Sequence, residues 1–145
     1  MNKMTQTWLD SFQRLIEKVF GRIKGSQLSQ KYHSLFTIEY QTLISPRYAI
    51  KDILHLEKLN ASQTQCLSLL SPLQNSNHYR LHFYSQQERY LDEYIPVLEN
   101  LNLRVMDQVQ FSFQAEGTDC FIKSFTIKAA KKQCAPFYQL RSRIL

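Results

Sequence analysis

The stretch from residue 79 to residue 105 constrains the fold more than any other part of the chain. It reads YRLHFYSQQERYLDEYIPVLENLNLRV. Apolar and polar residues alternate over 79–84, as in a half-buried strand. The apolar residues then recur at helical spacing, and alternation returns at Leu103 and Val105. Two strands joined by one helix in so few residues are typical of a small α+β sandwich.

A helical arm is expected before this unit. Apolar residues recur at helical spacing over 8–23, and Gly21 and Gly25 are expected to end that helix, with Gly25 as its left-handed cap. A short second helix is expected over 26–33. Ser45 followed by Pro46 predicts the start of a further helix, because a hydroxyl cap and a proline in the first turn both favour helix initiation.

From residue 45 the expected order is helix, strand, strand, helix, strand, strand. Strands are expected near 66–70, 79–84, 103–113 and 121–127, with Asp107 as a break and Gly117 in a hairpin turn. This order predicts a ferredoxin-like α+β sandwich, in which a four-stranded, mostly antiparallel sheet carries two helices on one face. The expected domains are a helical arm (1–44), an α+β domain (45–130) and a basic tail (131–145) that ends in the start of a truncated helix.

The positive charge is concentrated at the C-terminal end. Residues 1–120 carry 12 basic and 12 acidic side chains, whereas 121–145 carry six basic and no acidic ones, which gives the net charge of +6. No apolar run approaches the ~20 residues of a membrane span, and no signal-peptide core begins the chain. The three cysteines form no metal-binding or disulfide pattern. A cytoplasmic protein without a membrane partner is therefore expected.

Catalytic, cofactor-binding and metal sites are not predicted. Three glycines cannot form a glycine-rich phosphate loop. His78 and His82 lie four apart on a strand, about 13 Å from each other, so they cannot share one metal ion. His82 is expected to be a partly exposed strand residue. Asp92 and Glu93 favour a helix start rather than acid–base chemistry, and Cys120 has no partner that would activate its thiol.

Several aromatic residues fall on predicted strands, and two interpretations of them stay open. They form either part of the core or an exposed face that stacks RNA bases. The second interpretation, combined with the basic tail, describes a nucleic-acid-binding module as an alternative function. The residues concerned are Tyr79, Phe83, Phe111, Phe113, Phe121 and Phe125.

A set of residues spread over 8–128 resembles one enzyme family. The arm carries Trp8, Gly21, Gly25, Leu28, Tyr32, Phe36 and Tyr40, and the next helix carries Pro46, Ala49, Asp52 and Ile53. The most specific block comprises Pro96, Leu98, Glu99, Asn100, Asn102 and Val105, and Phe125 and Ile127 follow on the last strand. In their order and spacing these residues resemble the segment that precedes the catalytic core in large bacterial NAD-specific glutamate dehydrogenases. Asn102 stands where that family has glycine, His82 where it has lysine, and Thr37 where it often has proline.

The resemblance implies an ACT-like regulatory or assembly domain without catalytic residues. It implies a parent enzyme that oxidatively deaminates L-glutamate to 2-oxoglutarate and ammonia, with NAD bound elsewhere in that enzyme. The implied partners are the rest of the parent polypeptide and a second copy paired through a sheet edge, with no nucleic acid. An effector would contact the loop of Ser85, Gln86, Gln87 and Arg89, although this loop lacks the glycine typical of amino-acid-binding ACT domains. A stand-alone amino-acid sensor is a further alternative.

Overall fold

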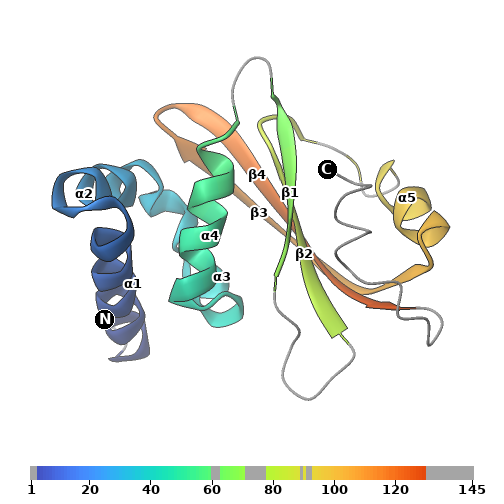
Figure 1. Ribbon diagram of the computed structural model, residues 1–145, viewed down its shortest axis with the longest axis horizontal. Coiled ribbons are helices and arrows are strands. Elements are labelled where there is room, and N and C mark those ends of the chain that lie inside the picture. The colour runs from blue at the N-terminus through green and yellow to red at the C-terminus, as the bar shows by residue number, and fades with distance from the viewer. Residues whose placement is uncertain (1–2, 60–62, 71–77, 89, 91–92, 130–145) are drawn as a thin grey trace.

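The computed structural model describes residues 3–59, 63–70, 78–88, 90 and 93–129 (Figure 1). The predicted basic tail and Cys134 lie outside these residues. Within them, no helix is both long enough and apolar enough to span a bilayer. The elements in chain order are α1 (Lys3–Phe20), α2 (Arg22–Lys31), the 3-10 helix η1 (His33–Leu35), α3 (Ile38–Leu43), α4 (Pro46–Leu56), β1 (Gln65–Leu69), β2 (His78–Ser85), α5 (Ile95–Asn100), β3 (Leu103–Ala115) and β4 (Thr118–Ala129).

The four strands form one antiparallel sheet in the order β1-β2-β4-β3. The β3–β4 hairpin closes with Ala115 opposite Thr118. Its two turn residues, Glu116 and Gly117, have φ angles of 53° and 79°, and a two-residue turn with both φ angles positive matches the twist of the flanking strands. The predicted α+β class, the element order and the antiparallel four-stranded sheet are confirmed.

The prediction that two helices share one face of the sheet is wrong. Adjacent residues of a strand point to opposite faces. Phe83 packs against Tyr94, just before α5, with ring centroids 4.4 Å apart, whereas the Tyr84 hydroxyl donates to Asp52 of α4. Therefore α4 and α5 cover opposite faces, and Figure 1 shows them on either side of β1 and β2. Apolar residues on both faces of the strands are the physical reason.

A bulge in β3 moves its side chains from one face to the other. Leu103 and Val105 lie in the core beneath α5, whereas Phe111 and Phe113 lie in the core on the arm side. The register shifts between Val105 and Asp107, and one extra residue reverses the alternation of a strand. The break expected at Asp107 is thus confirmed.

The sheet separates two hydrophobic cores. The arm-side core joins α1, α2, α3 and α4 to Tyr84, Phe111, Phe113 and Ile122, and the second core joins α5 to Leu81, Phe125 and Ile127. Five of the six aromatic strand residues are divided between these cores, and Phe121 is partly buried outside both. The common exposed aromatic face that a base-stacking module needs therefore does not form.

The helical arm turns earlier than expected. Gly21, with φ at 88°, separates α1 from α2, and Ile23 beyond it is 77% exposed. Gly25 is no cap but lies buried inside α2, where an added Cβ would lie 3.1 Å from the Ile16 carbonyl oxygen. The glycine that adopts positive φ is therefore Gly21, and Gly25 permits the close packing of α2 on α1.

Candidate functional site

The described part of the predicted effector loop forms a turn held by Ser85 and by backbone hydrogen bonds. Ser85 is buried; its Oγ lies 3.0 Å from the backbone N–H of Gln87 and 2.6 Å from the Gln87 carbonyl oxygen. The backbone N–H of Gln86 donates to the Thr64 carbonyl at 3.3 Å. Arg89 lies outside the described residues. These contacts are those of a tight turn, in which Gln86 is partly exposed and Gln87 is exposed.

The block with the most specific resemblance forms α5 and the turn after it. Pro96 lies in the first turn of α5, Leu98 is completely buried, and Asn102 has a φ of 60°. Asn102 thus ends α5 in the left-handed conformation that asparagine tolerates well. Glu99 and Asn100 are exposed on the same helix, and Val105 is partly buried in β3. The structure places this block in packing and capping roles around one helix.

A buried aspartate joins the helical arm to the sheet. Asp52 of α4 is 0% exposed. Its Oδ2 accepts a hydrogen bond from the Tyr40 hydroxyl at 2.5 Å, and its Oδ1 accepts from the Tyr84 hydroxyl at 2.5 Å. Nδ1 of His82 lies 2.8 Å from the same Oδ1. A buried carboxylate is tolerated only when donors replace its lost hydration, and three donors do so here.

His82 differs from its prediction, because it is 0% exposed rather than partly exposed. It pairs across the sheet with Ser68 and Ser124 beneath α4. Its Nε2 atom has no hydrogen-bond partner among the described residues. Asp52 therefore fixes the ring through Nδ1 alone.

The tyrosines of this cluster act as donors. Burial, and after it the Asp52 carboxylate, raises the pKa of Tyr40 and of Tyr84 well above the ordinary value of 10. Both hydroxyls therefore remain protonated and donate to Asp52. His55 stacks on Tyr84 with ring centroids 5.2 Å apart, and burial lowers the pKa of His55. Since these groups are buried and bonded to one another, the arrangement suits a structural link rather than contact with a substrate.

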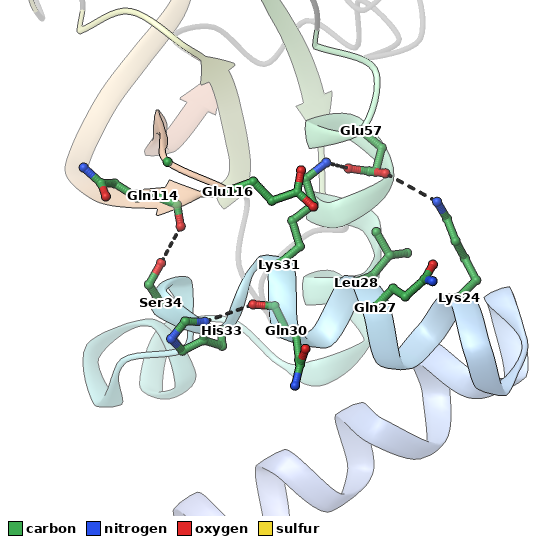
Figure 2. Close-up of a pocket in the computed structure, with 11 residues that line it drawn as sticks. Lys24, Gln27, Leu28, Gln30, Lys31, His33, Ser34, Glu57, Gln114 and Glu116 are labelled. Atoms are coloured by element: carbon green, nitrogen blue, oxygen red, sulfur yellow. Dashed lines mark hydrogen bonds and ion pairs between the residues drawn. The ribbon is translucent and has the colours of Figure 1, made fainter.

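A polar cleft lies on the surface between the arm and the sheet (Figure 2). Its volume is about 840 Å³, which is within the usual range of small-ligand sites. Residues of α2 and η1 form one wall, Glu57 after α4 forms another, and the tip of the β3–β4 hairpin forms the third. The charged residues that line it are Lys24, Lys31, Glu57 and Glu116.

Glu57 contacts three other residues at this cleft. Lys31 Nζ lies 2.7 Å from Oε2 of Glu57, Lys24 Nζ lies 4.0 Å from Oε1, and the Tyr32 hydroxyl also donates to Oε2. Burial alone would raise the pKa of Glu57, but the hydrogen bonds from Lys31 and Tyr32 and the lysine charges outweigh it and lower that pKa. On the opposite wall the Ser34 hydroxyl donates to the Gln114 carbonyl at 2.7 Å.

Sequence reasoning missed both sites. Two features of the sequence could have indicated the cluster. Asp52 lies on the apolar side of an amphipathic helix, and His82 and Tyr84 lie two residues apart on one face of a strand. The cleft had no such signal, because its walls come from three separate segments and the hairpin lies more than 50 residues along the chain from the other two.

Two parts of the chain, one after the other, match known protein families. Residues 14–59 match the family described as glutamate dehydrogenase, helical motif 2, and residues 65–139 match glutamate dehydrogenase, ACT3 domain. The ACT3 match alone covers more than half of the chain. The chain belongs to the glutamate dehydrogenase ACT3 domain family. The resemblance noted from the sequence is thereby confirmed.

Two curated relatives carry the name NAD-specific glutamate dehydrogenase. The relative from Pseudomonas aeruginosa is 25% identical over 130 residues, and the one from Halomonas elongata is 24% identical over 129 residues. Each alignment covers 87% of this chain but 8% of the relative. The chain therefore spans less than a tenth of the length of these relatives.

The buried cluster of this ACT3 family member crosses the boundary between the two family matches. Tyr40 and Asp52 belong to the helical motif, and His82 and Tyr84 belong to the ACT3 domain. The cleft is shared in the same way, with Glu57 on one side and Glu116 on the other. The helical motif and the ACT3 sheet thus pack as one unit.

The three glycines of this chain do not form a dinucleotide-binding turn. Gly21 lies between two helices, Gly25 lies inside a helix, and Gly117 lies in a hairpin. None of the three stands at a strand-to-helix turn, where a dinucleotide-binding fold places glycine against the pyrophosphate. Within the described residues, no group of three or more metal-binding side chains is present.

Proposed function

We propose that this chain is a non-catalytic regulatory and assembly segment of a large NAD-dependent glutamate dehydrogenase. The observation that carries the proposal is the pair of consecutive family matches, which cover the helical motif and the ACT3 sheet in that order. The Asp52 cluster supports it, because it makes these two matched parts one packed body. The parent enzyme would convert L-glutamate and NAD to 2-oxoglutarate, ammonia and NADH, with NAD bound outside this segment.

The test uses the Pseudomonas aeruginosa relative. The segment that matches this chain is replaced by a flexible linker of glycine and serine, and a second variant carries this chain in its place. We expect the linker variant to change in subunit assembly or in its response to effectors, and the chain-bearing variant to recover at least one of them. Unchanged assembly and unchanged effector response in the linker variant would contradict the proposal.

Self-association through a sheet edge is part of this proposal, and β3 offers the longer edge. β3 has 13 residues against five in β1. Ala115 and Thr118 form the hydrogen-bonded pair that closes the two-residue hairpin. Hydrogen-bonded and non-hydrogen-bonded pairs alternate along antiparallel strands, so the backbone N–H and C=O groups of Gln110, Ser112 and Gln114 point away from β4. The Gln114 carbonyl already accepts a hydrogen bond from the Ser34 hydroxyl. Gln110 and Ser112 therefore mark the part of the edge available to a second copy.

Substitution at Ser112 tests this edge. Ser112→Pro removes an outward N–H without removing a hydrogen bond within the sheet. We expect the proline variant to sediment as a smaller species than the wild-type chain, and the Ser112→Ala control to behave as wild type. Equal sedimentation of all three would rule out pairing through this edge.

We place an effector in the cleft rather than in the loop of residues 85–87, because a ligand in the cleft would contact both matched parts. Calorimetric titration with a panel of amino acids tests this placement. Lys24→Ala should weaken the binding, whereas Lys18→Ala, an exposed lysine on α1, should not. Equal effects of the two substitutions would contradict the placement.

A further inference from the structure

A group of basic side chains lies on the arm-side face of the sheet, beyond the helices. Alternation places Arg80 of β2 on this face, because His82 and Tyr84 point the same way toward Asp52. Lys128 of β4 lies on it because Ile127 points into the opposite core, and Arg104 of β3 lies on it because Leu103 and Val105 also point into that core. Arg80, Arg104 and Lys128 form what we call the basic sheet face.

The described helices of the arm cover only part of the arm-side face of the sheet, and this part does not include the basic sheet face. Along β2, Tyr84 and His82 are completely buried, whereas Arg80 and His78 are half-buried. Along β4 the same fall in burial runs from Ile122 to Lys128, which is exposed. Figure 1 shows the lower ends of β2, β3 and β4 twisting away from α3 and α4. The basic sheet face is thus outside the core, on a part of the sheet that the described helices do not cover.

Two of the positive charges on this face repel each other. Lys128 of β4 lies directly opposite Arg104 of β3. Like charges directly opposite each other destabilise an antiparallel pair. Asp107, in the next cross-strand row, lies opposite Thr126. Burial lowers the pKa of Arg80 and the Asp107 carboxylate acts against this, so Asp107 partly balances the charge of Arg80. An anionic partner would relieve this repulsion.

The shape of the face favours one class of partner. Adjacent strands lie about 4.8 Å apart, so the row of three strands spans about 10 Å of pleated surface. The Cβ atoms of acidic residues one turn apart on a helix are separated by about 5–6 Å, which is close to this strand spacing. The positions on this face from the three strands include no phenylalanine, tyrosine or tryptophan (His78, Arg80, Arg104, Asp107, Thr126, Lys128), so they lack the large aromatic rings on which bases of a single strand stack.

We propose that the basic sheet face binds an acidic segment of a protein partner. The inference rests on the register, the burial and the charge of these strands, and it stands independently of the proposed role in glutamate dehydrogenase.

The experiment measures binding of the 145-residue chain to poly-L-glutamate and, separately, to polyuridylate at low salt. The wild-type chain is compared with Arg104→Ala/Lys128→Ala and with Lys18→Ala/Arg22→Ala, a control that removes the same charge from the exposed helical arm. We expect the sheet variant to bind poly-L-glutamate about three- to tenfold more weakly than the control. Equal affinities of the two variants would overturn the proposal.

Two further readouts keep the result interpretable. Because the substitutions remove a repulsion between β3 and β4, the sheet variant should unfold in urea at the same concentration as wild type or at a higher one. If the sheet variant loses affinity for polyuridylate but retains its affinity for poly-L-glutamate, the face belongs to a nucleic-acid site and the proposal is wrong.

Discussion

Oδ1 of Asp52 on α4 lies 2.8 Å from Nδ1 of His82 on β2, and both side chains are completely inaccessible to solvent. The two residues belong to different family matches, so this contact joins the helical motif to the ACT3 sheet. A buried acidic side chain is costly when it loses its donors, and this one retains Tyr40, His82 and Tyr84. The stability of the whole unit should therefore depend on Asp52.

Asp52→Asn should destabilise the chain by about 3–5 kcal/mol, because the amide presents donors to groups that need an acceptor. The midpoint of urea unfolding measures the change. Asp10→Asn, an exposed site on α1, serves as the control and should change stability by less than about 0.5 kcal/mol. Equal midpoints for the two variants would show that Asp52 is not the link described above.

Tyr40→Phe and Tyr84→Phe should each cost about 1–3 kcal/mol, since each removes one donor from the buried carboxylate. Because both hydroxyls serve the same residue, the two effects should not add. A double-mutant cycle on urea unfolding measures the coupling. Strict additivity would mean that the two hydrogen bonds act independently.

The glycines of the arm should respond differently to alanine. Gly25→Ala should destabilise the chain by about 1–2 kcal/mol despite its better helix propensity, since the new Cβ would meet the backbone of Ile16 and Glu17 at 3.1–3.3 Å. Gly21→Ala meets no atom within 4 Å and should cost about 1 kcal/mol through its positive φ alone. Thermal unfolding compares them, and a stabilising Gly25→Ala would contradict the close packing of α1 and α2.

Protonation of Glu57 should lower the stability of the folded chain at acidic pH. Its pKa in the folded chain is below the ordinary value of 4.5, so its contacts with Lys31 and Tyr32 contribute stability above that value and lose it as the pH falls through the acidic range. The contribution should stay below about 1 kcal/mol, because solvent still reaches this partly exposed pair and screens it. The stability difference between wild type and Glu57→Gln should therefore shrink from pH 7 to pH 3, and a constant difference would refute this assignment.

The elements formed by local chemistry could be predicted from the sequence. Pro46 begins α4, Asn102 ends α5, and Gly117 closes the hairpin, since each acts through its own backbone preference. The hydroxyl cap expected from Ser45 is not formed, because its side chain makes no cap hydrogen bond. Long-range relations could not be predicted in the same way. The alternation of β2 gives two faces without saying which helix covers each, so the helices were wrongly expected on one face.

The Asp52 cluster shows the same limit within the candidate site. A histidine on a strand is by itself compatible with an exposed or a buried position. Only the packing of α4 brings Asp52 to His82, 30 residues further along the chain. The cleft depends in addition on the hairpin reaching α2, and no local pattern encodes that approach.

The most direct test of the central claim is a measurement of NADH formation from L-glutamate and NAD by the purified 145-residue chain. The Pseudomonas aeruginosa enzyme serves as the positive control under identical conditions. We expect NADH formation by the control and none above the buffer blank by this chain at any concentration. NADH formation that rises in proportion to the concentration of this chain would contradict its assignment as a non-catalytic segment.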